Sequence, residues 1–444
     1  MWSAGKYSAR AIPVLHIPGK SRRIYLMSTW SRWAIAARSS LAAENISGAG
    51  IQDKVRQPPH LDVERQALAK RYARERQWLS LINLGISSAL ILVLLFTGLG
   101  FHLRAVLAPR ADWQPVTGWR PLLIGLYFLV LYGVALVVGL PFSYYGGYIL
   151  PHRYGQNIQS LQAFVADMAK GLALGLTFEL VAVEFIYALL ALTPNTWWLW
   201  AGLAMLAVTA LMANLAPVIF LPLFFKLTPL PDGAVKERAL ALAAQTKTRV
   251  QGIYSMNMSS KTTATNAMVI GLGNTRRIVL GDTLLDRYTE DEIAVVVAHE
   301  LGHQVHRDIP KLILVETLTT LGGFALVNLV LHAVVDRVPQ YHGLADPATM
   351  PLVAAVLFAF ALILLPVTNG FSRLVEHQAD VFALEATHDP LAFIGAMTRL
   401  ANQNLAELEP PRIVEFMLHN HPSVGRRLAY ARANQARFSA SARG

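Results

Sequence analysis

The chain has 444 residues, of which 54% are hydrophobic and only 15% are charged, and it contains no cysteine. This composition indicates a membrane protein, and the lack of cysteine excludes disulfides and thiolate metal sites. The net charge of +11 is a weak sign of nucleic-acid binding, because fourteen Arg and Lys residues lie in the first 78 residues, ahead of the first apolar run. Basic segments of this kind are expected beside a membrane, so no nucleic-acid partner is predicted.

The N-terminal region is basic and has no apolar run long enough to cross a membrane. Residues 1–59 are predicted to form a flexible extension that resembles a transit peptide. Within it, the stretch RWAIAARSSLAA can alternatively form a short interfacial helix. Residues 60–78 predict a polar helix that leads into the bilayer.

Six apolar segments follow, each near the roughly 20 residues that a helix needs to cross the hydrocarbon core. The third segment contains Glu179 and Glu184, and the fifth contains Glu316. Charge is costly in hydrocarbon, so these carboxyl groups are expected either in a hydrogen-bonded protein interior or in a wet cavity. The six predicted spans are residues 79–102, 121–142, 171–192, 196–222, 312–335 and 349–370.

The distribution of basic residues between these spans predicts their orientation. Fourteen Arg and Lys residues precede the first span, whereas Arg337 is the single one between the fifth and the sixth. The positive-inside rule then places both termini in the cytoplasm, together with residues 143–170, 223–311 and 371–444. The segments that carry the chemistry described below would therefore share one side of the membrane.

A metal-binding pattern lies directly before the fifth span, in the stretch TEDEIAVVVAHELGH. Thr289 and Glu292 form a capping-box pattern, which predicts the start of a helix. His299 and His303 are four residues apart, so both imidazoles lie on one helical face and can bind one ion. Glu300 lies beside them, as in zinc sites that use a glutamate as general base. The alternative is a helix with two exposed histidines.

A catalytic zinc ion has three protein ligands and one open position, so a third His or carboxylate is required. The stretch SRLVEHQADVFALEA supplies Glu376, and Asp380 lies four residues later on the same helical face. Glu376 can complete the ligand set. Asp380 can accept the outer N–H of either His299 or His303 and fix its tautomer. His377 is an alternative third ligand, although it points away from the face of Glu376 and Asp380.

The two halves of this site flank the last two predicted spans. His299 and His303 precede the fifth span, and Glu376 follows the sixth. Two antiparallel spans joined by a short loop bring their outer ends together on one side of the membrane. The hairpin would thus bring together the two halves of the metal site. At this position the site could cut polypeptide chains that are held near the bilayer.

Six separate stretches are similar to a known family. They are LPFSYYGGYILPHRYGQNIQS (140–160), APVIFLPLFFKLTPLPDG (216–233), SSKTTATNAMVIGLGNTRRIVLGDTLL (259–285), HELGHQVHRD (299–308), NGFSRLVEHQAD (369–380) and HPSVGRR (421–427). Over roughly residues 60–435 the chain resembles the zinc-dependent type I CAAX prenyl proteases and their prokaryotic relatives. Heat-shock-type membrane proteases share the zinc motif, but they would not be expected to show the first two stretches.

The resemblance implies a mainly α, polytopic membrane protein whose spans enclose a chamber, with a zincin-like metalloprotease domain that carries a small β-sheet. It also implies a division of the chain. The expected parts are an extension (1–59), a membrane domain of four spans (60–225), two halves of the protease domain (226–308 and 371–435) around a transmembrane hairpin (309–370), and a flexible tail (436–444).

The resemblance further implies one Zn²⁺ per chain. The residues at the matching positions would be His299, His303 and Glu376 as ligands, Glu300 as base and acid, Asn266 and Ala267 as main-chain contacts to the substrate, and His421 and Arg427 beside the reaction centre. The tetrahedral oxyanion needs a donor besides the metal, and His421 or Arg427 can provide it. The substrate would lie extended along TNAMVIG as an added strand at a sheet edge.

The expected function is that of an integral-membrane zinc metalloendopeptidase acting on membrane-associated or CAAX-like proteins. The lack of cysteine and the roughly threefold excess of Arg over Lys suit a bacterial inner-membrane protein. Prenylated substrates are not expected in most bacteria, so a misfolded or unprenylated membrane protein is an alternative substrate. General quality control is the rival function. A transporter with a structural zinc site is a further rival, disfavoured because structural sites have four protein ligands.

Overall fold

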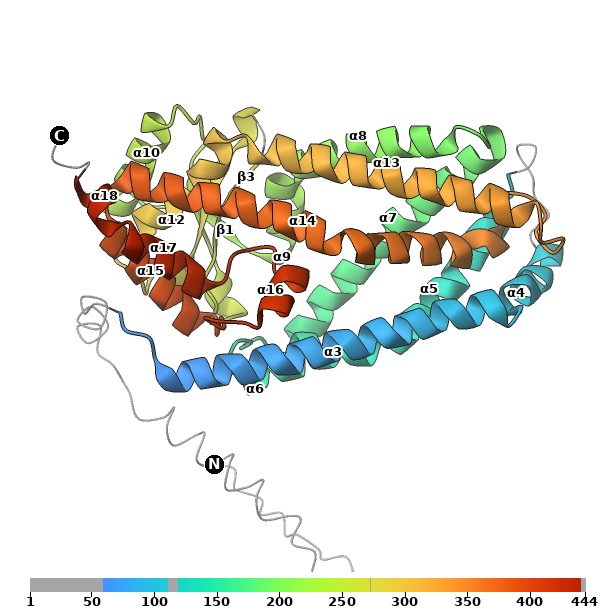
Figure 1. Cartoon of the computed structure of the whole chain (residues 1–444), viewed down its shortest axis with the longest axis horizontal. Coiled ribbons are helices and arrows are strands. Elements are labelled where there is room, and N and C mark those ends of the chain that lie inside the picture. Colours follow the sequence, from blue (N-terminus) through green and yellow to red (C-terminus); the bar gives the residue numbers. More distant parts are fainter. Residues whose placement is uncertain (1–58, 111–118, 272, 441–444) are drawn as a thin grey trace, which may run out of the picture. The chain divides into compact units, whose positions relative to one another are not determined.

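The computed structural model describes residues 59–110, 119–271 and 273–440 (Figure 1). The predicted extension up to residue 58, with the stretch RWAIAARSSLAA, lies outside the described residues. All the elements described below belong to one compact unit that begins at Gln57.

Six helical segments of this unit are long and apolar enough to cross a membrane. Large apolar side chains on these helices are exposed, for example Val137 and Ile363, each 72% accessible. Such surfaces are stable in lipid and not in water, so the chain is a multi-pass membrane protein. The six segments are Val63–Phe96, Pro121–Arg153, Leu161–Leu192, Trp197–Phe224, Asp308–Val335 and Pro347–Thr387.

Four of the predicted spans lie within these segments, and the fourth span of the chain, 196–222, begins one residue before its segment. The first ends earlier than expected. Helix α3 (Val63–Phe96) is capped by Asp62 and joins the predicted polar helix and the first span into one continuous element. It ends because Gly98 has φ +74°, a left-handed conformation that glycine adopts at little cost. The short helix α4 (Leu99–Leu107) follows. The prediction of a span over 79–102 was therefore wrong at its end.

Two of the long segments are interrupted by π-helical turns, which are rare and frequently occur at functional sites. One is η2 (Tyr145–Ile149) and the other is η3 (Ala216–Phe220). Both lie in stretches that carry the family resemblance. The elements of this region are α5 (Pro121–Tyr144), η2, α6 (Leu150–Arg153), α7 (Leu161–Leu192), α8 (Trp197–Leu215), η3 and α9 (Leu221–Phe224).

One end of the long helices is held together by buried side chains. Trp197 and Phe324 pack with their ring centroids 5.6 Å apart, and Asp346 forms a buried ion pair with Arg104. Of the acids predicted to need a protein or aqueous environment, Glu184 accepts a hydrogen bond from Trp119 Nε1 at 3.3 Å. This carboxyl group therefore has a protein partner, as the cost of charge in hydrocarbon requires.

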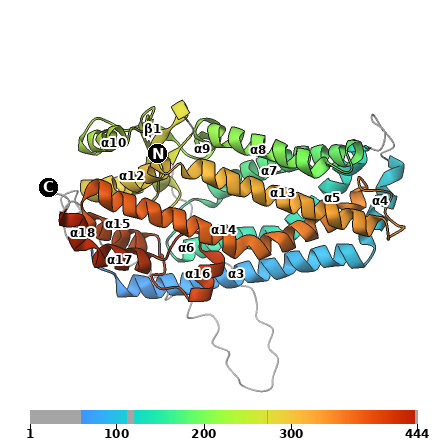
Figure 2. The ribbon, with the colours of Figure 1, turned by 45° about the horizontal axis from the view of Figure 1, so that its top comes forward.

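The two halves of the predicted metal site belong to three helices. Helix α12 (Glu290–Val305) is separated from α13 (Asp308–Val335) by Arg307, which has φ 56°. Helix α14 (Met350–Thr387) follows the 3₁₀ turn η6 (Pro347–Thr349) and continues unbroken from the last span through the second half of the site. Helices α13 and α14 lie side by side in Figures 1 and 2. The predicted hairpin is thus present.

A small mixed sheet lies beside α12. Its strand order is β1-β2-β4-β3, in which β2 and β4 are parallel and the outer pairs are antiparallel. Strand β3 pairs only with β4 within the sheet, so it has one free edge. The strands are β1 (Leu227–Pro229), β2 (Ile253–Met256), β3 (Ala267–Ile270) and β4 (Arg277–Gly281), and the helices around them are α10 (Ala234–Gln245), η4 (Met258–Ser260), η5 (Gly273–Thr275) and α11 (Asp282–Leu285).

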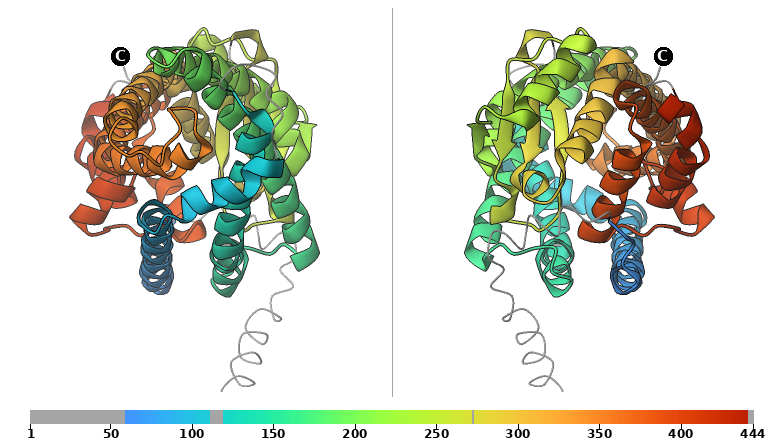
Figure 3. Two further views of the ribbon diagram at one scale, coloured as in Figure 1. Left: turned by 90° about the vertical axis from the view of Figure 1, so that its right-hand side faces the viewer. Right: turned by 90° about the vertical axis from the view of Figure 1, so that its left-hand side faces the viewer.

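The C-terminal helices lie at the same end of the long helices as the sheet (Figures 1 and 3). They are α15 (Pro390–Gln403), α16 (Arg412–Leu418), α17 (Val424–Ala433) and α18 (Gln435–Ala440). Phe438 is only 2% exposed and belongs to the core that α12 and α15 share. The tail predicted to be flexible from residue 436 is therefore helical as far as Ala440, because this side chain anchors it.

Candidate metal centre

Helix α12 begins with the capping box that the sequence predicts. The Thr289 side chain accepts a hydrogen bond from Glu292 N at 3.2 Å, and the Glu292 carboxylate accepts one from Thr289 N at 2.9 Å. Val297, Ala298 and Leu301 bury the opposite face of the helix in the core. This packing fixes the rotation of α12, and with it the direction of the two histidines.

Three candidate ligands meet between α12 and α14. One nitrogen of His299, one of His303 and a carboxylate oxygen of Glu376 all lie within 4.8 Å of one another. His299 Nε2 lies 3.3 Å from Glu376 Oε2, and His303 Nε2 lies 3.6 Å from Glu376 Oε1. The folding of two helices far apart in sequence therefore brings together a two-imidazole, one-carboxylate donor set.

This donor set fits a zinc ion. Glu376 Oε2 is buried and accepts no well-oriented hydrogen bond from the residues that the structure describes. An unsatisfied buried carboxylate oxygen is costly, and a cation would satisfy it. Two imidazoles and a carboxylate are also a common ligand set of catalytic zinc. The alternative ligand, His377, packs instead against the ring of Tyr430 at 4.7 Å and is not in the cluster.

Each histidine has a carboxylate behind it. Asp380 Oδ1 lies 3.0 Å from His299 Nδ1, as expected for one of the two histidines. Asp308 Oδ2 lies 3.0 Å from His303 Nδ1, and the side chain of Asp308 is 1% exposed. This contact was not predicted from the sequence. Asp308 follows His303 by five residues, and this position could have indicated the contact. The break between α12 and α13 lies between the two residues and turns the chain back toward the imidazole ring of His303.

Arg427 reaches this region from α17. Its Nε and Nη2 atoms donate to the two oxygens of Asp380 at 2.8 and 2.5 Å. Arg427, which was expected beside the reaction centre, thus has a specific partner in Asp380. A bidentate guanidinium fixes a carboxylate more firmly than a single bond, and Asp380 in turn contacts His299.

Burial and neighbouring charges shift the pKa values of two residues on α12, Glu300 and His299. Burial raises the pKa of Glu300 above its usual value, and the two adjacent imidazoles oppose that rise. For His299, burial lowers the pKa, but the carboxylates of Asp380 and Glu376 outweigh it and raise the pKa to about 9. Glu300 Oε2 also accepts a hydrogen bond from Val269 N of strand β3 at 3.3 Å.

The free edge of β3 faces this site. Asn266 O accepts a hydrogen bond from Gly281 N at 2.9 Å, so the carbonyl of Asn266 belongs to the pairing with β4. Main-chain groups alternate in direction along a strand. Ala267 and Val269 therefore direct their N–H and C=O groups away from β4. The Asn266 side chain accepts a hydrogen bond from Ala267 N at 3.0 Å.

His421 lies before helix α17. Its Nε2 atom is 3.2 Å from Glu376 Oε1, and its side chain is 54% exposed. The helix begins at Val424, with Ser423 as its N-cap residue. His421 is therefore in the connecting loop, directly beside the ligand cluster.

A cavity of about 1010 Å³ opens onto these groups. Its wall includes Tyr72 and Arg76 of helix α3, so the first long helix contributes to the same space as the metal cluster. Asp380 is not part of this wall and lies behind His299. Eight of the nine predicted site residues line the cavity: Asn266, Ala267, His299, Glu300, His303, Glu376, His421 and Arg427.

Comparison with protein families identifies two regions. Residues 229–435 match the model of peptidase family M48, and residues 55–226 match a CAAX prenyl protease N-terminal domain described as having five membrane helices. In this region the described residues of the present chain form four long apolar segments and the short α4.

Several curated proteins are similar along most of the chain. A probable CAAX prenyl protease 1 of Schizosaccharomyces pombe is 29% identical, over 83% of this chain and 80% of that protein. A CAAX prenyl protease 1 homolog of Arabidopsis thaliana is 30% identical, over 66% of this chain and 69% of that protein. The uncharacterized metalloprotease YhfN of Bacillus subtilis is 27% identical, over 82% and 85%.

A solved structure shares the fold. The crystal structure of Ste24p from S. mikatae matches with a TM-score of 0.70 at 22% identity, covering 90% of this chain and 97% of the other. The predicted fold class, a mainly helical membrane protein with a protease domain and a small sheet, is thereby confirmed.

Proposed function

Because the chain belongs to peptidase family M48, among the homologues of CAAX prenyl protease 1, we propose that this membrane metalloendopeptidase holds one Zn²⁺ on His299, His303 and Glu376. The observation that carries the proposal is the convergence of these three donors within 4.8 Å. The buried Oε2 atom of Glu376, which accepts no well-oriented hydrogen bond from the described residues, supports the same proposal. The proposed activity is hydrolysis of a peptide bond in a protein substrate at the membrane.

Glu300 is the proposed general base and acid. When bound, Zn²⁺ supplies a Lewis acid that lowers the pKa of water and polarises a carbonyl group. Glu300 takes a proton from the attacking water and returns it to the leaving amine. The raised pKa of its buried carboxyl group suits both steps, because it brings the group nearer to neutral pH. The bond from Val269 N holds one carboxylate oxygen in place.

Asp380, Arg427 and Asp308 are proposed positioning residues. Asp308 orients the ring of His303, and Asp380 orients the ring of His299, so that the opposite nitrogen of each faces the cluster. Arg427 holds Asp380 through two bonds. This assignment places the charge of Arg427 close to the reaction centre, while its two hydrogen bonds go to Asp380.

The substrate is proposed to lie as an added strand on the free edge of β3. Main-chain groups of Ala267 and Val269 point toward that edge, and Glu300 is bonded to one of them. Pairing along the edge would therefore place the scissile bond beside Glu300, the proposed base. Main-chain hydrogen bonds bind an extended peptide with little regard to its sequence. His421, exposed beside Glu376, is the proposed donor to the oxyanion.

The function is tested with the purified full chain in lipid nanodiscs. Zinc content near one per chain, cleavage of peptides, loss of cleavage on chelation and recovery with Zn²⁺ are expected. Stoichiometric zinc without cleavage of any peptide would contradict the peptidase assignment. Paired farnesylated and unmodified peptides of one sequence would then decide whether the substrate is prenylated, as the names of the relatives suggest.

The site is proposed to face the cytoplasm, in a bacterial inner membrane. The support is the concentration of basic residues in the segments that form this end of the structure. Because the chain has no cysteine, a cysteine introduced at Glu290 can be labelled without background. Protection of Glu290→Cys from an impermeant reagent in intact cells, with labelling after permeabilisation, is expected. Labelling in intact cells would reverse the orientation.

A further inference from the structure

One face of helix α14 is apolar and exposed along the last span. Ile363 and Val367 are four residues apart and Leu374 follows seven residues later, so the three side chains share one side of the helix. All three are more than half exposed, and in a bilayer such a face is covered by acyl chains. This apolar stripe (Ile363, Val367 and Leu374) continues past residue 370, where the predicted span ends.

Helix α16 adds to this apolar surface. Ile413 and Phe416 are three residues apart on it, and both are more than half exposed. The helix lies beside α14 in Figures 1 and 2, and Arg373, next to Leu374, donates to Phe416 O at 3.3 Å. Contiguous exposed apolar side chains mark contact with a membrane or another protein. Continuity with the stripe on the last span indicates the membrane.

A groove begins at the end of the apolar stripe. Its volume is about 400 Å³, and Gly370 and Leu374 of α14 form part of its wall. Arg373 of α14 and both Arg426 and Arg427 of α17 line it as well. Leu374 and Arg426 are exposed, so the groove opens to the surface. A molecule packed on the stripe can therefore place its end in the groove.

The groove has an excess of positive charge. Arg427 is paired with Asp380 through two hydrogen bonds, and the buried carboxylate of Glu415 lies 3.3 Å from Arg426 Nε. Arg373 Nη1 donates to three main-chain carbonyl groups, which do not neutralise its charge. Among the residues that the structure describes, three guanidinium groups of the groove thus have two carboxylate partners.

Arg426 can bind a further anion. Its side chain is 64% exposed, and in the described part of the chain it has no carboxylate partner besides Glu415. A guanidinium group has five N–H donors, so donors remain for a second partner. Guanidinium groups bind phosphate through two parallel hydrogen bonds. A phosphate beside Arg426 and Arg373 would supply the negative charge that the groove lacks.

The apolar stripe and the cationic groove together fit a phospholipid. Its acyl chains would cover Ile363 and Val367, and its phosphate would enter the groove. Basic pockets between membrane helices bind anionic headgroups on the cytoplasmic side, which is the side proposed for this end of the chain. A zwitterionic headgroup fits less well, because its ammonium group would be repelled by the three arginines.

We propose that this groove is a binding site for an anionic phospholipid such as phosphatidylglycerol. Arg426 is the main partner of the phosphate and Arg373 the second. The apolar stripe holds the acyl chains. The site is separate from the metal cluster, although Pro422 and Arg427 line both the groove and the metal cavity.

The headgroup would also hold the loop that carries His421. Arg373 Nη1 donates to His419 O at 2.5 Å, and the carboxylate of Glu415 accepts a hydrogen bond from Ser423 N at 3.0 Å. These bonds fix the loop on both sides of His421. A phosphate bound by both arginines would tie α14 to α17 across the loop. Bound lipid is therefore expected to raise kcat, a consequence that rests on the proposed peptidase function, whereas the site itself does not.

Binding is measured on the purified full chain in nanodiscs that contain phosphatidylglycerol and phosphatidylcholine with the same acyl chains. Native mass spectrometry after release from the nanodisc counts the molecules of each lipid that stay bound. Phosphatidylglycerol should be enriched on the wild type. Arg426→Gln should lower this enrichment about tenfold, as the loss of a charge-assisted hydrogen bond requires. Arg426→Lys should retain part of it, because the charge is kept.

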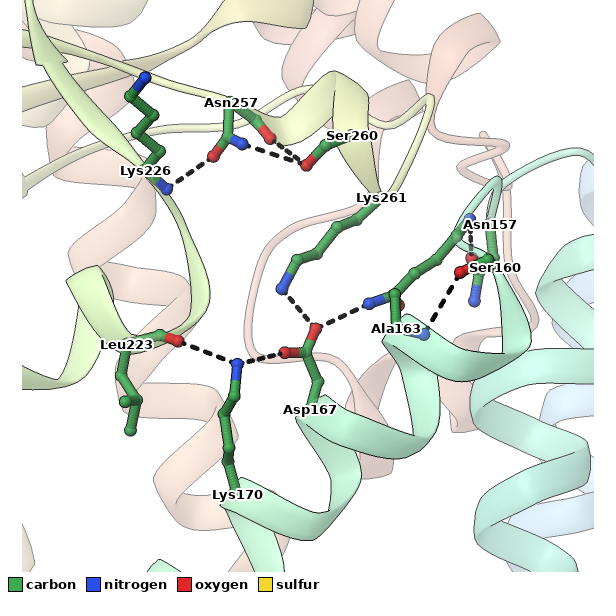
Figure 4. A network of polar contacts seen from close by, with 11 residues as sticks. Asn157, Ser160, Ala163, Asp167, Lys170, Leu223, Lys226, Asn257, Ser260 and Lys261 are labelled. Atoms are coloured by element: carbon green, nitrogen blue, oxygen red, sulfur yellow. Dashed lines mark hydrogen bonds and ion pairs between the residues drawn. The ribbon is translucent and has the colours of Figure 1, made fainter.

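Two variants that remove a charge elsewhere are the controls. Arg432→Gln is the matched control, because Arg432 is exposed on the same helix but lies outside the groove wall. Lys170→Gln changes a second basic cluster, in which Lys170 and Lys261 share Asp167 (Figure 4). Both should leave the enrichment unchanged. A loss in both controls equal to that in Arg426→Gln would show attraction by the net charge of the chain, which overturns the site.

Other results also overturn the site. One is equal retention of phosphatidylglycerol by the wild type and Arg426→Gln. Another is binding of glycerol 3-phosphate, which has no acyl chains, as tightly as phosphatidylglycerol, because the groove would then hold a soluble phosphate. Dimers that form in place of lipid binding and dissociate on Phe416→Ser would assign the apolar surface to a second copy of the chain.

Kinetics on one peptide test the link to the reaction. As phosphatidylglycerol replaces phosphatidylcholine, kcat of the wild type should rise about fivefold or more, as coupling between two sites typically gives, and kcat of Arg426→Gln should stay constant. Lipid binding that depends on Arg426 together with a constant wild-type kcat supports the site and refutes its link to His421. The binding measurement needs no cleavage, so it decides the site even if the proposed peptidase function fails.

Discussion

His303 Nδ1 and Asp308 Oδ2 lie 3.0 Å apart, on opposite sides of the break between helices α12 and α13. The break at Arg307, with φ 56°, turns the start of α13 back toward the ring. Lys311 Nζ contacts the other oxygen of Asp308 at 3.0 Å. One end of the first hairpin helix is thereby coupled directly to a proposed zinc ligand.

Asp308→Ala is expected to weaken zinc binding by about 10–100-fold, as the loss of an outer partner of a histidine ligand typically does. The physical reason is that His303 loses the acceptor that fixes its tautomer. Zinc affinity measured against a competing chelator tests this. Lys311→Ala is the control, because a half-exposed lysine contributes little. Equal affinities of Asp308→Ala and the wild type would refute the role of Asp308.

The ligand set itself is tested by alanine variants at neighbouring positions. His303→Ala and Glu376→Ala should each purify without zinc, because two protein ligands do not retain the ion. His377→Ala is the matched control, since His377 is adjacent in sequence but packs on Tyr430. Metal content by mass spectrometry decides the matter. An empty site in His377→Ala with zinc retained in Glu376→Ala would show that the third ligand is misassigned.

Zinc affinity should depend on pH. In the metal-free protein the carboxylates of Asp380 and Glu376, acting against burial, raise the pKa of His299 to about 9. A ligand imidazole must be neutral, so below that pH binding has to release a proton. Affinity should therefore fall about tenfold for each pH unit below 9. Titrations between pH 6 and 8.5 measure the slope, and an affinity that is flat over this range would contradict the assignment.

His421→Ala is expected to lower kcat by about 10²–10³-fold with zinc retained, because an oxyanion donor acts mainly in the transition state. His419→Ala is the control, since this side chain lines the same cavity but, unlike that of His421, forms no ion pair with Glu376. Steady-state kinetics on one peptide, with metal content checked for each variant, provide the comparison. A wild-type kcat in His421→Ala would show that His421 is not the oxyanion donor and that its loop has only a structural role.

Much of this architecture was predictable from the sequence because each signal was local. The capping box at Thr289 and the spacing of His299 and His303 depend on the geometry of a single helix. Glu376 was also predictable as a ligand, because a hairpin of two apolar segments brings its two outer ends together. The spans were recognisable for the same reason, as uninterrupted apolar runs.

The remaining features depend on contacts that no local pattern encodes. The end of α3 is set by Gly98, which reads as an ordinary glycine in an apolar run. The pairing of Arg427 with Asp380 joins residues 47 positions apart on two helices. The contact of Asp167 with Lys261 joins the membrane domain to the protease domain across 94 positions. Such pairings follow from packing and were not predictable from periodicity or spacing.

Glu300 is proposed to activate water beside zinc without being a ligand of the metal. The most direct measurement is peptide hydrolysis by Glu300→Gln, with zinc content determined on the same preparation. The amide keeps the shape of the side chain but cannot accept the proton, so turnover should fall by at least about 10²-fold while zinc stays stoichiometric. Glu407→Gln, a carboxylate on the wall of the same cavity, should remain active. Wild-type turnover by zinc-loaded Glu300→Gln would show that Glu300 is not the base.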